Sequence, residues 1–180
     1  DLHSFPTRRS SDLEPVKNDK QTLDFGAFTI EVPKTWTKVK RQGIDSYVGE
    51  IAIDSVDTIG FDLGIWSNSL TEQQPIIWER STIQNDKSID TTQIVLVDDS
   101  KGIDPDKYRR QSLTWDTIDG REAKIVYPRR PGHGIIGIYI DSLWISKFDI
   151  DRFNLYGRNL KPEHEREFLR AIKTLRFRKR

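Results

Sequence analysis

Bulky apolar residues occupy every second position from 59 to 65, and this is the strictest pattern in the chain. One face would carry Ile59, Phe61, Leu63 and Ile65, and the other Gly60, Asp62, Gly64 and Trp66. Successive side chains of a β-strand point to opposite faces, so the pattern predicts a strand with one buried face. Positions 46–53 alternate in the same way, and the short polar segment 54–58 between the two predicts an antiparallel hairpin.

The stretch 120–144 predicts a second pair of strands, at 122–127 and 135–140. Both segments are rich in β-branched and aromatic residues, which suit the pleated, half-buried surface of a sheet. The loop 128–134 that joins them contains two prolines, two glycines, two arginines and a histidine. The strands are expected at the centre of the sheet, and the loop is the first candidate for a site.

Strand signals also precede and follow these pairs. Positions 23–32 form a strand pattern with a bulge or turn near Gly26, and Pro33 ends it because proline cannot extend a central strand. Trp36 is expected to anchor the core over that turn. The segment 113–118 leads through the turn dipeptide Asp119-Gly120 into the strand at 122–127.

Two further regions leave alternatives open or add short elements. Positions 76–83 and 91–97 are interpreted as two strands with a turn at 85–88, although 75–84 also fits a short helix. Asp104-Pro105 is a plausible start for a helix of one or two turns. Positions 153–156 are expected to add an edge strand.

A C-terminal helix is predicted from Pro162 onward. Proline suits the first helical position, and the glutamates at 163, 165 and 167 favour the positive N-terminal end of a helix. The buried stripe at helical spacing consists of Phe168, Leu169, Ile172 and Leu175. The predicted fold class is α+β, with a mostly antiparallel sheet of about six to eight strands and this helix packed on it.

The N-terminus has a different character from the rest. The chain contains no Met, and positions 1–13 (DLHSFPTRRSSDL) resemble the conceptual translation of a common sequencing adapter. These residues are expected to be an artefact and are left out of the fold. Positions 14–21 are polar and interpreted as a linker, so that 22–180 form a single domain. The native start is then expected to be missing, which makes the lack of a signal peptide uninformative.

Charge and cysteine content limit the classes of partner. The chain has 29 Lys and Arg against 28 Asp and Glu, a formal net charge of +1. A balance this even predicts no nucleic acid partner and no anionic membrane surface. Cys is absent, which excludes disulfides, thiolate zinc sites and a cysteine nucleophile. No apolar run reaches the roughly 18 residues that a membrane-spanning helix needs.

The loop 128–134 supplies the first candidate binding residues. Arg129 and Arg130 offer planar groups of N–H donors, His133 lies beside them, and the glycines let backbone amides approach an anion or carboxylate. The competing interpretation is a solvated loop whose basic residues keep a sheet edge soluble. Trp66 and Trp144 are further candidates, as stacking surfaces for a sugar or base, against the alternative of ordinary packing.

The sequence predicts no catalytic residues, no metal ligands and no cofactor. No Gly-x-Ser-x-Gly elbow occurs, and His164 is interpreted as a surface residue or a neighbour of the helix cap. One acidic cluster lacks the spacing of a calcium loop: Asp98, Asp99, Asp104 and Asp106. Other aspartates are interpreted as solvated turn residues, although they could pair as general acid and base: Asp45, Asp54, Asp57 and Asp62.

Three motifs together carry a family resemblance. They are the opening Phe28, Ile30, Val32, Pro33 and Trp36, the hairpin Asp119-Gly120 with Ala123, and the ending Thr174-Leu175-Arg176-Phe177. With this order of elements the chain resembles the Mog1/PsbP-like fold. It is also similar to uncharacterised exported or lipoprotein-like bacterial proteins. The resemblance implies an α/β/α sandwich and a non-enzymatic accessory or binding role, and it implies no catalytic residues.

The resulting functional hypothesis is an exported or lipid-anchored bacterial accessory protein, periplasmic or membrane-anchored outside the cytoplasm. Its partner would be a protein or a small molecule, and its membrane contact would come only through an N-terminal anchor. Two alternatives remain open. One is a small hydrolase with a site near His133, and the other is an intracellular partner-binding module.

Overall fold

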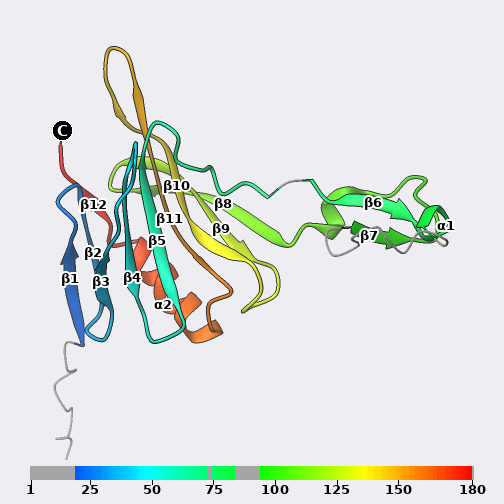
Figure 1. Cartoon of the computed structure of the whole chain (residues 1–180), viewed down its shortest axis with the longest axis horizontal. Coiled ribbons are helices and arrows are strands. Elements are labelled where there is room, and N and C mark those ends of the chain that lie inside the picture. Colours follow the sequence, from blue (N-terminus) through cyan, green and yellow to red (C-terminus); the bar gives the residue numbers. More distant parts are fainter. Residues whose placement is uncertain (1–18, 73, 84–93, 180) are drawn as a thin grey trace, which may run out of the picture.

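The computed structural model describes residues 19–72, 74–83 and 94–179 (Figure 1). Within these residues a main sheet contains seven strands, all paired antiparallel. Their spatial order is β3 (Thr37–Lys40), β4 (Tyr47–Ala52), β5 (Thr58–Gly64), β11 (Ile150–Arg158), β10 (Ile135–Ile145), β9 (Arg121–Pro128) and β8 (Gln111–Ile118).

A smaller sheet and a helix cover one face of the main sheet. The small sheet has the order β1 (Lys20–Asp24), β2 (Phe28–Pro33) and β12 (Arg176–Phe177), and the helix is α2 (Pro162–Ile172). A mostly antiparallel sheet with a C-terminal helix confirms the α+β class. The turn expected near Gly26 separates β1 from β2, and Gly26 adopts φ 81° there.

The main core lies between the two sheets and α2. The alternating strands contribute their predicted faces, with Ile59 fully buried in β5 and Phe153 fully buried in β11. Phe168 of α2 is also fully buried, because the helix turns its predicted apolar stripe toward the sheet. Trp36 is 1% exposed, so the sequence-based expectation of a core anchor is confirmed.

The strand pairs predicted within the main sheet are present. β4 pairs with β5 from Ala52↔Thr58 to Tyr47↔Leu63, and β9 pairs with β10 from Lys124↔Tyr139 to Val126↔Gly137. β8 pairs with β9 from Ile118↔Arg121 to Gln111↔Pro128. Asp119 and Gly120 form the turn between β8 and β9, with φ of 49° and 75°. Positive φ at both central positions gives the turn a twist that matches paired strands, which explains the Asp-Gly dipeptide.

Residues 153–156 form a strand as predicted, but the prediction that this strand lies at the edge of the sheet was wrong. These residues belong to β11, which lies between β5 and β10 near the middle of the sheet. The pattern already indicated burial on one face, because Phe153 and Leu155 alternate with Asn154 and Tyr156. The neighbours of a strand are set by distant segments, however, and the pattern of a single strand does not specify them.

An arm extends from the main sheet (Figure 1). It comprises β6 (Ile76–Glu79), α1 (Arg80–Ile83) and β7 (Ile94–Val97). The sequence left two alternatives open for this region, a pair of strands or a short helix. Each is present in part, because two short strands form and a one-turn helix follows the first of them. β6 and β7 pair in parallel, which a four-residue turn cannot achieve because a parallel connection needs about a dozen residues or more. The turn expected at 85–88 lies outside the described residues.

At the N-terminus, β1 begins at Lys20. Lys20 and Gln21, the last residues of the expected linker, therefore belong to a strand, while positions 1–13 and 14–18 lie outside the described residues. The predicted short helix after Asp104 is a 3-10 helix, Pro105–Tyr108, capped by the Asp104 side chain. Among the described helices, none is long and apolar enough to cross a membrane.

Candidate functional site

The loop 128–134 is held firmly at its base. The backbone N–H of Arg129 donates to the carbonyl of Arg110 at 2.8 Å, and that of Gly134 donates to Oδ1 of Asn159 at 2.7 Å. The N–H of Gly132 donates to the carboxylate of Glu165, which is 7% exposed in the first turn of α2. The loop is therefore a fixed surface feature, attached to the starts of β8 and α2 and to the end of β11.

The side chains proposed from sequence point outward from this loop. Arg130 and His133 are exposed and close a tight turn, with the N–H of His133 donating to the carbonyl of Arg130 at 3.1 Å. The Arg129 guanidinium donates to the carbonyl of Lys107 at 3.3 Å. These residues thus form a basic rim, and a cleft lies beside this rim.

A cleft of about 380 Å³ opens next to the loop, at the root of the arm. We call it the basic cleft. Its lining includes Arg110 and Gln111 at the start of β8, Arg158 at the end of β11, and Gly134 and Ile135 at the start of β10. The segment that leads to the arm closes the other side. Its volume is in the range of roughly 300–1,000 Å³ that small-molecule sites occupy.

The basic cleft combines cationic and apolar lining. Arg110 and Arg158 supply two guanidinium groups, and Leu70 and Ile135 contribute apolar surface. Glu72 also lines the cleft, but its carboxylate accepts hydrogen bonds from the backbone N–H groups of Arg110 and Gln111, all at 2.9 Å. The excess positive charge and the planar donors of arginine fit an anionic group attached to an apolar body.

Sequence reasoning found the loop but missed Arg110 and Arg158. Neither arginine belongs to a motif, and the two come from strands that lie apart in the chain. The main sheet places the start of β8 and the end of β11 at the same end. No local signal could have identified them.

Trp66 and Trp144 lie at the opposite end of the main sheet from the loop. From Ile135 to Trp144, β10 rises by about 30 Å at roughly 3.3 Å per residue. Trp144 is part-buried, packs against the main core and donates its indole N–H to the carbonyl of Arg178 at 3.2 Å. Trp66 is 79% exposed. The five residues proposed from sequence therefore do not form one site.

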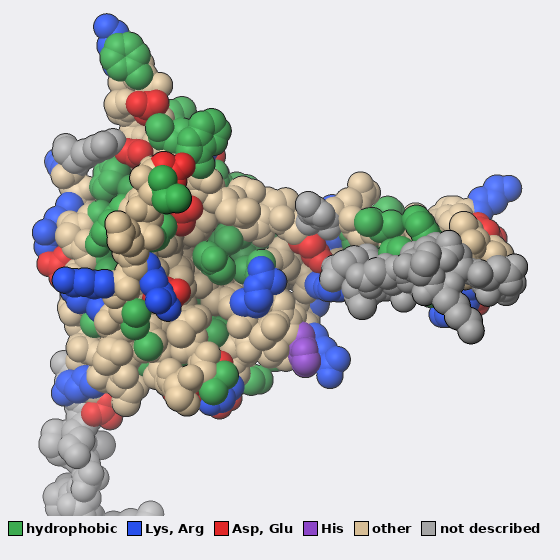
Figure 2. All heavy atoms as spheres, viewed as in Figure 1, with side chains coloured by type: hydrophobic (Ala, Val, Ile, Leu, Met, Phe, Trp, Pro, Cys, Tyr) green, Lys and Arg blue, Asp and Glu red, His purple; other side chains and the backbone are tan. Residues whose placement is uncertain are grey.

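A hairpin projects from the main sheet and has an apolar tip (Figures 1 and 2). β10 and β11 pair up to Ile145↔Ile150, and Phe148 lies in the turn. Ile145 is 73% exposed and Phe148 is 84% exposed. We call Ile145, Phe148 and Ile150 the hairpin tip. Apolar groups gathered on a projection are typical of contact surfaces.

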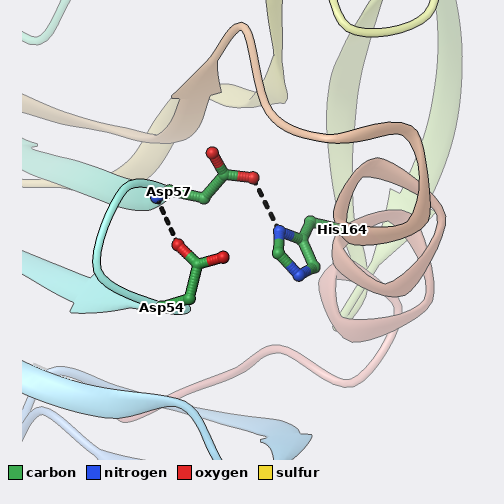
Figure 3. Close-up of side chains that lie close together, drawn as sticks. All are labelled: Asp54, Asp57 and His164. Atoms are coloured by element: carbon green, nitrogen blue, oxygen red, sulfur yellow. Dashed lines mark hydrogen bonds and ion pairs between the residues drawn. The ribbon is translucent and has the colours of Figure 1, made fainter.

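A second cluster joins Asp54, Asp57 and His164 (Figure 3). The loop between β4 and β5 folds back because Oδ1 of Asp54 accepts from the backbone N–H groups of Val56 and Asp57, at 2.8 and 2.7 Å. Asp57 is thereby directed toward the start of α2. Its Oδ2 accepts from the backbone N–H of Lys161 at 2.8 Å and lies 2.6 Å from Nδ1 of His164.

This cluster corrects two expectations. Asp57 is 5% exposed and is not a solvated turn residue. The His164 side chain is 17% exposed and shares the Asp57 carboxylate with the N-cap residue Lys161, so it is a neighbour of the helix cap and not a surface residue. Lys161 at the start of α2 has no side-chain cap of its own, so Asp57 supplies an acceptor at the positive end of the helix. The cluster attaches the β4–β5 loop to α2, and we call it the Asp57 clamp.

Ligand atoms of Asp54, Asp57 and His164 lie within 4.8 Å of one another, which is close enough to consider a metal. The ammonium of Lys161, however, lies 2.5 Å from Oδ2 of Asp54. This hydrogen bond, with the two backbone N–H groups, holds the pKa of Asp54 well below its usual range. A cation already neutralises the carboxylate, so the arrangement fits a structural clamp better than a metal centre.

The outer face of the main sheet carries a polar network. Oδ1 of Asp141 accepts from the Tyr139 hydroxyl at 2.6 Å and from Nε of Arg152 at 3.1 Å. Burial, with the negative charge of Asp141, raises the pKa of Tyr139 to about 12, and these donors lower the pKa of Asp141. Lys124 is 8% exposed, donates to Thr71 at 2.7 Å, and has its pKa lowered by burial.

A small hydrolase with a site near His133 would bring His133, Asp141 and a serine into one hydrogen-bonded array. Asp141 lies well along β10 from the loop that carries His133, and it bonds to Tyr139 and Arg152 instead. Within the described residues this array is not formed. Comparison of the chain with models of known protein families and with curated proteins found no match.

Proposed function

We propose that this chain is a non-enzymatic binding protein that holds a small anionic molecule in the basic cleft. The observation that carries the proposal is that Arg110 and Arg158, both exposed, line a cleft of about 380 Å³ together with apolar residues. Arg158 makes no ion pair with any described residue, so its guanidinium is available to a ligand. Gly134 lets the backbone of the loop 128–134 form part of the wall.

The titratable groups favour binding over catalysis. A general acid or base works best with a pKa near the working pH. The pKa values of Tyr139 and Asp141 are shifted away from neutral pH, because the pKa of Tyr139 is raised to about 12 and that of Asp141 is lowered. His164 is engaged by Asp57, and His133 stands exposed on the loop. These features support a role in holding a ligand.

A direct test compares phenyl phosphate with phenol in calorimetric titrations. Phenyl phosphate is expected to bind and phenol to bind much more weakly, because only the phosphate can pair with arginine. Arg158→Gln should weaken phenyl phosphate by about tenfold, the effect of losing one hydrogen bond to a charged group. Arg170→Gln, which changes an exposed arginine of α2 outside the cleft, is the matched control.

Two results would overturn the proposal. One is equal affinity of Arg158→Gln and Arg170→Gln for phenyl phosphate, and the other is equal binding of phenol and phenyl phosphate. The hydrolase alternative is tested separately, by assaying ester hydrolysis with and without His133→Ala. Hydrolysis that His133→Ala abolishes would support it, and hydrolysis unaffected by that change would remove it.

We further propose the Mog1/PsbP-like sandwich as the fold and the bacterial periplasm or outer face of a membrane as the location. Both rest on the resemblance of the three sequence motifs, and the α+β sheet with its C-terminal helix is compatible with that fold. Recovery of the upstream coding sequence tests the location. A signal peptide with a lipidation cysteine supports export, and an ordinary start codon at the domain boundary refutes it.

The hairpin tip favours a second candidate function, docking onto a partner protein. Large apolar side chains that remain 73–84% exposed on a projection are unusual for a surface without a partner. A photo-crosslinking amino acid at position 148 should yield a protein adduct in producing cells. The same amino acid at the exposed position 122 should not, and equal adducts from both positions would remove this candidate.

A further inference from the structure

A second cavity, of about 500 Å³, opens at the edge of the core. It lies near the β3 edge of the main sheet, whereas the basic cleft lies toward the β8 edge. We call this second cavity the edge cavity. It lies where the turn after β1 meets the edge strand β3 and its neighbour β4. Its lining includes Phe25 from the turn, Lys38 and Lys40 from β3, Tyr47 from β4 and Phe61 from β5.

Three aromatic rings form the wall of the edge cavity. The Phe61 ring centroid lies 5.0 Å from that of Phe25 and 5.2 Å from that of Tyr47, both with the rings steeply inclined. Phe61 is 3% exposed and forms the floor, whereas Tyr47 is 45% exposed and Phe25 is part-buried. Parts of two rings thus remain accessible above a buried third ring.

The wall is fixed by its neighbours. The Tyr47 hydroxyl donates to the carbonyl of Phe25 at 2.7 Å, which joins the small sheet to the main sheet across the cavity. At Gly49, opposite Lys40 in the register, an added Cβ would lie 2.5 Å from the Phe61 ring. Glycine at this position lets the ring lie against the strand, so the floor depends on it.

The cationic groups beside this wall differ in what they contact. The Lys38 ammonium donates to the carbonyl of Asp24 at 2.5 Å and lies 5.4 Å from the Phe25 ring centroid. Arg41 pairs with Glu50 at 2.8 Å. The Lys40 ammonium makes no hydrogen bond or ion pair with any other described residue. It is exposed and faces Gly49 across the strand pair.

Lysines on an edge strand also have a general role, because they discourage pairing with another sheet. That role does not require aromatic surface beside them. The edge cavity places an unpaired ammonium next to accessible ring faces, and it is large enough for a small ligand. Aromatic rings stack on planar ligands, and one free ammonium matches one negative charge.

We propose that the edge cavity is a second binding site, for a planar aromatic monocarboxylate. The ring system of the ligand packs against Phe25, Tyr47 and Phe61, and its carboxylate pairs with Lys40. The site is independent of the basic cleft, since β3 and β8 form opposite edges of the main sheet.

The test uses 2-naphthoate as the probe and 2-naphthalenemethanol as its neutral analogue, in titrations followed by NMR. Saturable binding of 2-naphthoate is expected, with ring-current shifts at Phe25, Tyr47 and Phe61. Lys40→Gln should weaken 2-naphthoate by about fivefold, the effect of one partly exposed ion pair. Lys34→Gln is the matched control, since Lys34 is an exposed lysine outside the cavity.

Lys40→Gln should leave the affinity for phenyl phosphate unchanged, so that failure of this site and failure of the basic cleft are distinguishable. Tyr47→Leu removes an accessible ring and should weaken both 2-naphthoate and its neutral analogue. The proposal is overturned if 2-naphthoate shifts no resonance of the three aromatic residues. It is equally overturned if Lys40→Gln and Lys34→Gln bind the probe alike.

Discussion

Replacing Asp57 with Ala tests whether the Asp57 clamp holds α2 to the main sheet. The buried carboxylate accepts from the Lys161 backbone N–H at 2.8 Å and lies 2.6 Å from Nδ1 of His164. A hydrogen bond to a charged group contributes roughly 1.5 kcal/mol at the low end, so losing both costs about 3 kcal/mol. For a domain of this size that lowers Tm by about 6–12 °C.

The assay is urea unfolding followed by tryptophan fluorescence and circular dichroism. Asp57→Ala should lower the midpoint without changing the slope, because the native surface stays nearly the same. Asp57→Asn keeps an oxygen that can accept from Lys161 and should recover part of the loss. A double-mutant cycle with His164→Ala should give a coupling free energy of about 1 kcal/mol or more.

The reasoning would be refuted if Asp57→Ala cost less than about 0.5 kcal/mol, the effect of an ordinary surface substitution. Zinc provides a second check, because Asp54, Asp57 and His164 present ligand atoms within 4.8 Å of one another. Zinc at a small molar excess should leave Tm unchanged in both the parent chain and Asp57→Ala. Stabilisation by zinc in the parent chain alone would identify a metal centre in place of a clamp.

Three further predictions concern the core and the outer face. Phe168→Ala removes a fully buried ring of α2 and should cost about 3–5 kcal/mol in the free energy of unfolding, measured in urea. Gly137→Ala would place a Cβ 2.4 Å from the carbonyl oxygen of Leu155, so soluble folded protein should be largely lost on expression; normal yield would contradict this contact. The Tyr139 hydroxyl, donating to Asp141 with a pKa of about 12, should ionise last among the tyrosines in an absorbance titration at alkaline pH, and Tyr139→Phe should abolish that last step. Because this pKa is raised on folding, the stability that the hydroxyl contributes is complete below about pH 10 and is lost toward about pH 12.

Local patterns in the sequence predicted the elements whose signals are themselves local. Alternation from 59 to 65 requires only that neighbouring side chains point to opposite faces, and β5 has that form. The Asp119-Gly120 turn depends on its own backbone angles, and α2 depends on the spacing of its apolar stripe. For each of these, the residues that determine the structure lie within a few positions of one another.

The sites depended on residues that are distant in the chain, and the sequence did not reveal them. Asp57 and His164 lie 107 positions apart and meet only because β11 pairs with β5 and returns α2 to the β4–β5 loop. Arg110 and Arg158 likewise come together at one end of the sheet. Composition identified the loop 128–134 but not the basic cleft beside it, because a cleft forms only when several elements pack together.

The sequence by itself therefore determined the class of fold, the main hairpins and the C-terminal helix, through periodicity and turn chemistry. Tertiary structure decided that β11 lies inside the sheet, that β6 and β7 pair in parallel, and which charges are buried. The physical reason is that strand order and side-chain enclosure follow from the free energy of the whole packed chain. Alternation within one strand carries no information about which strand will lie beside it.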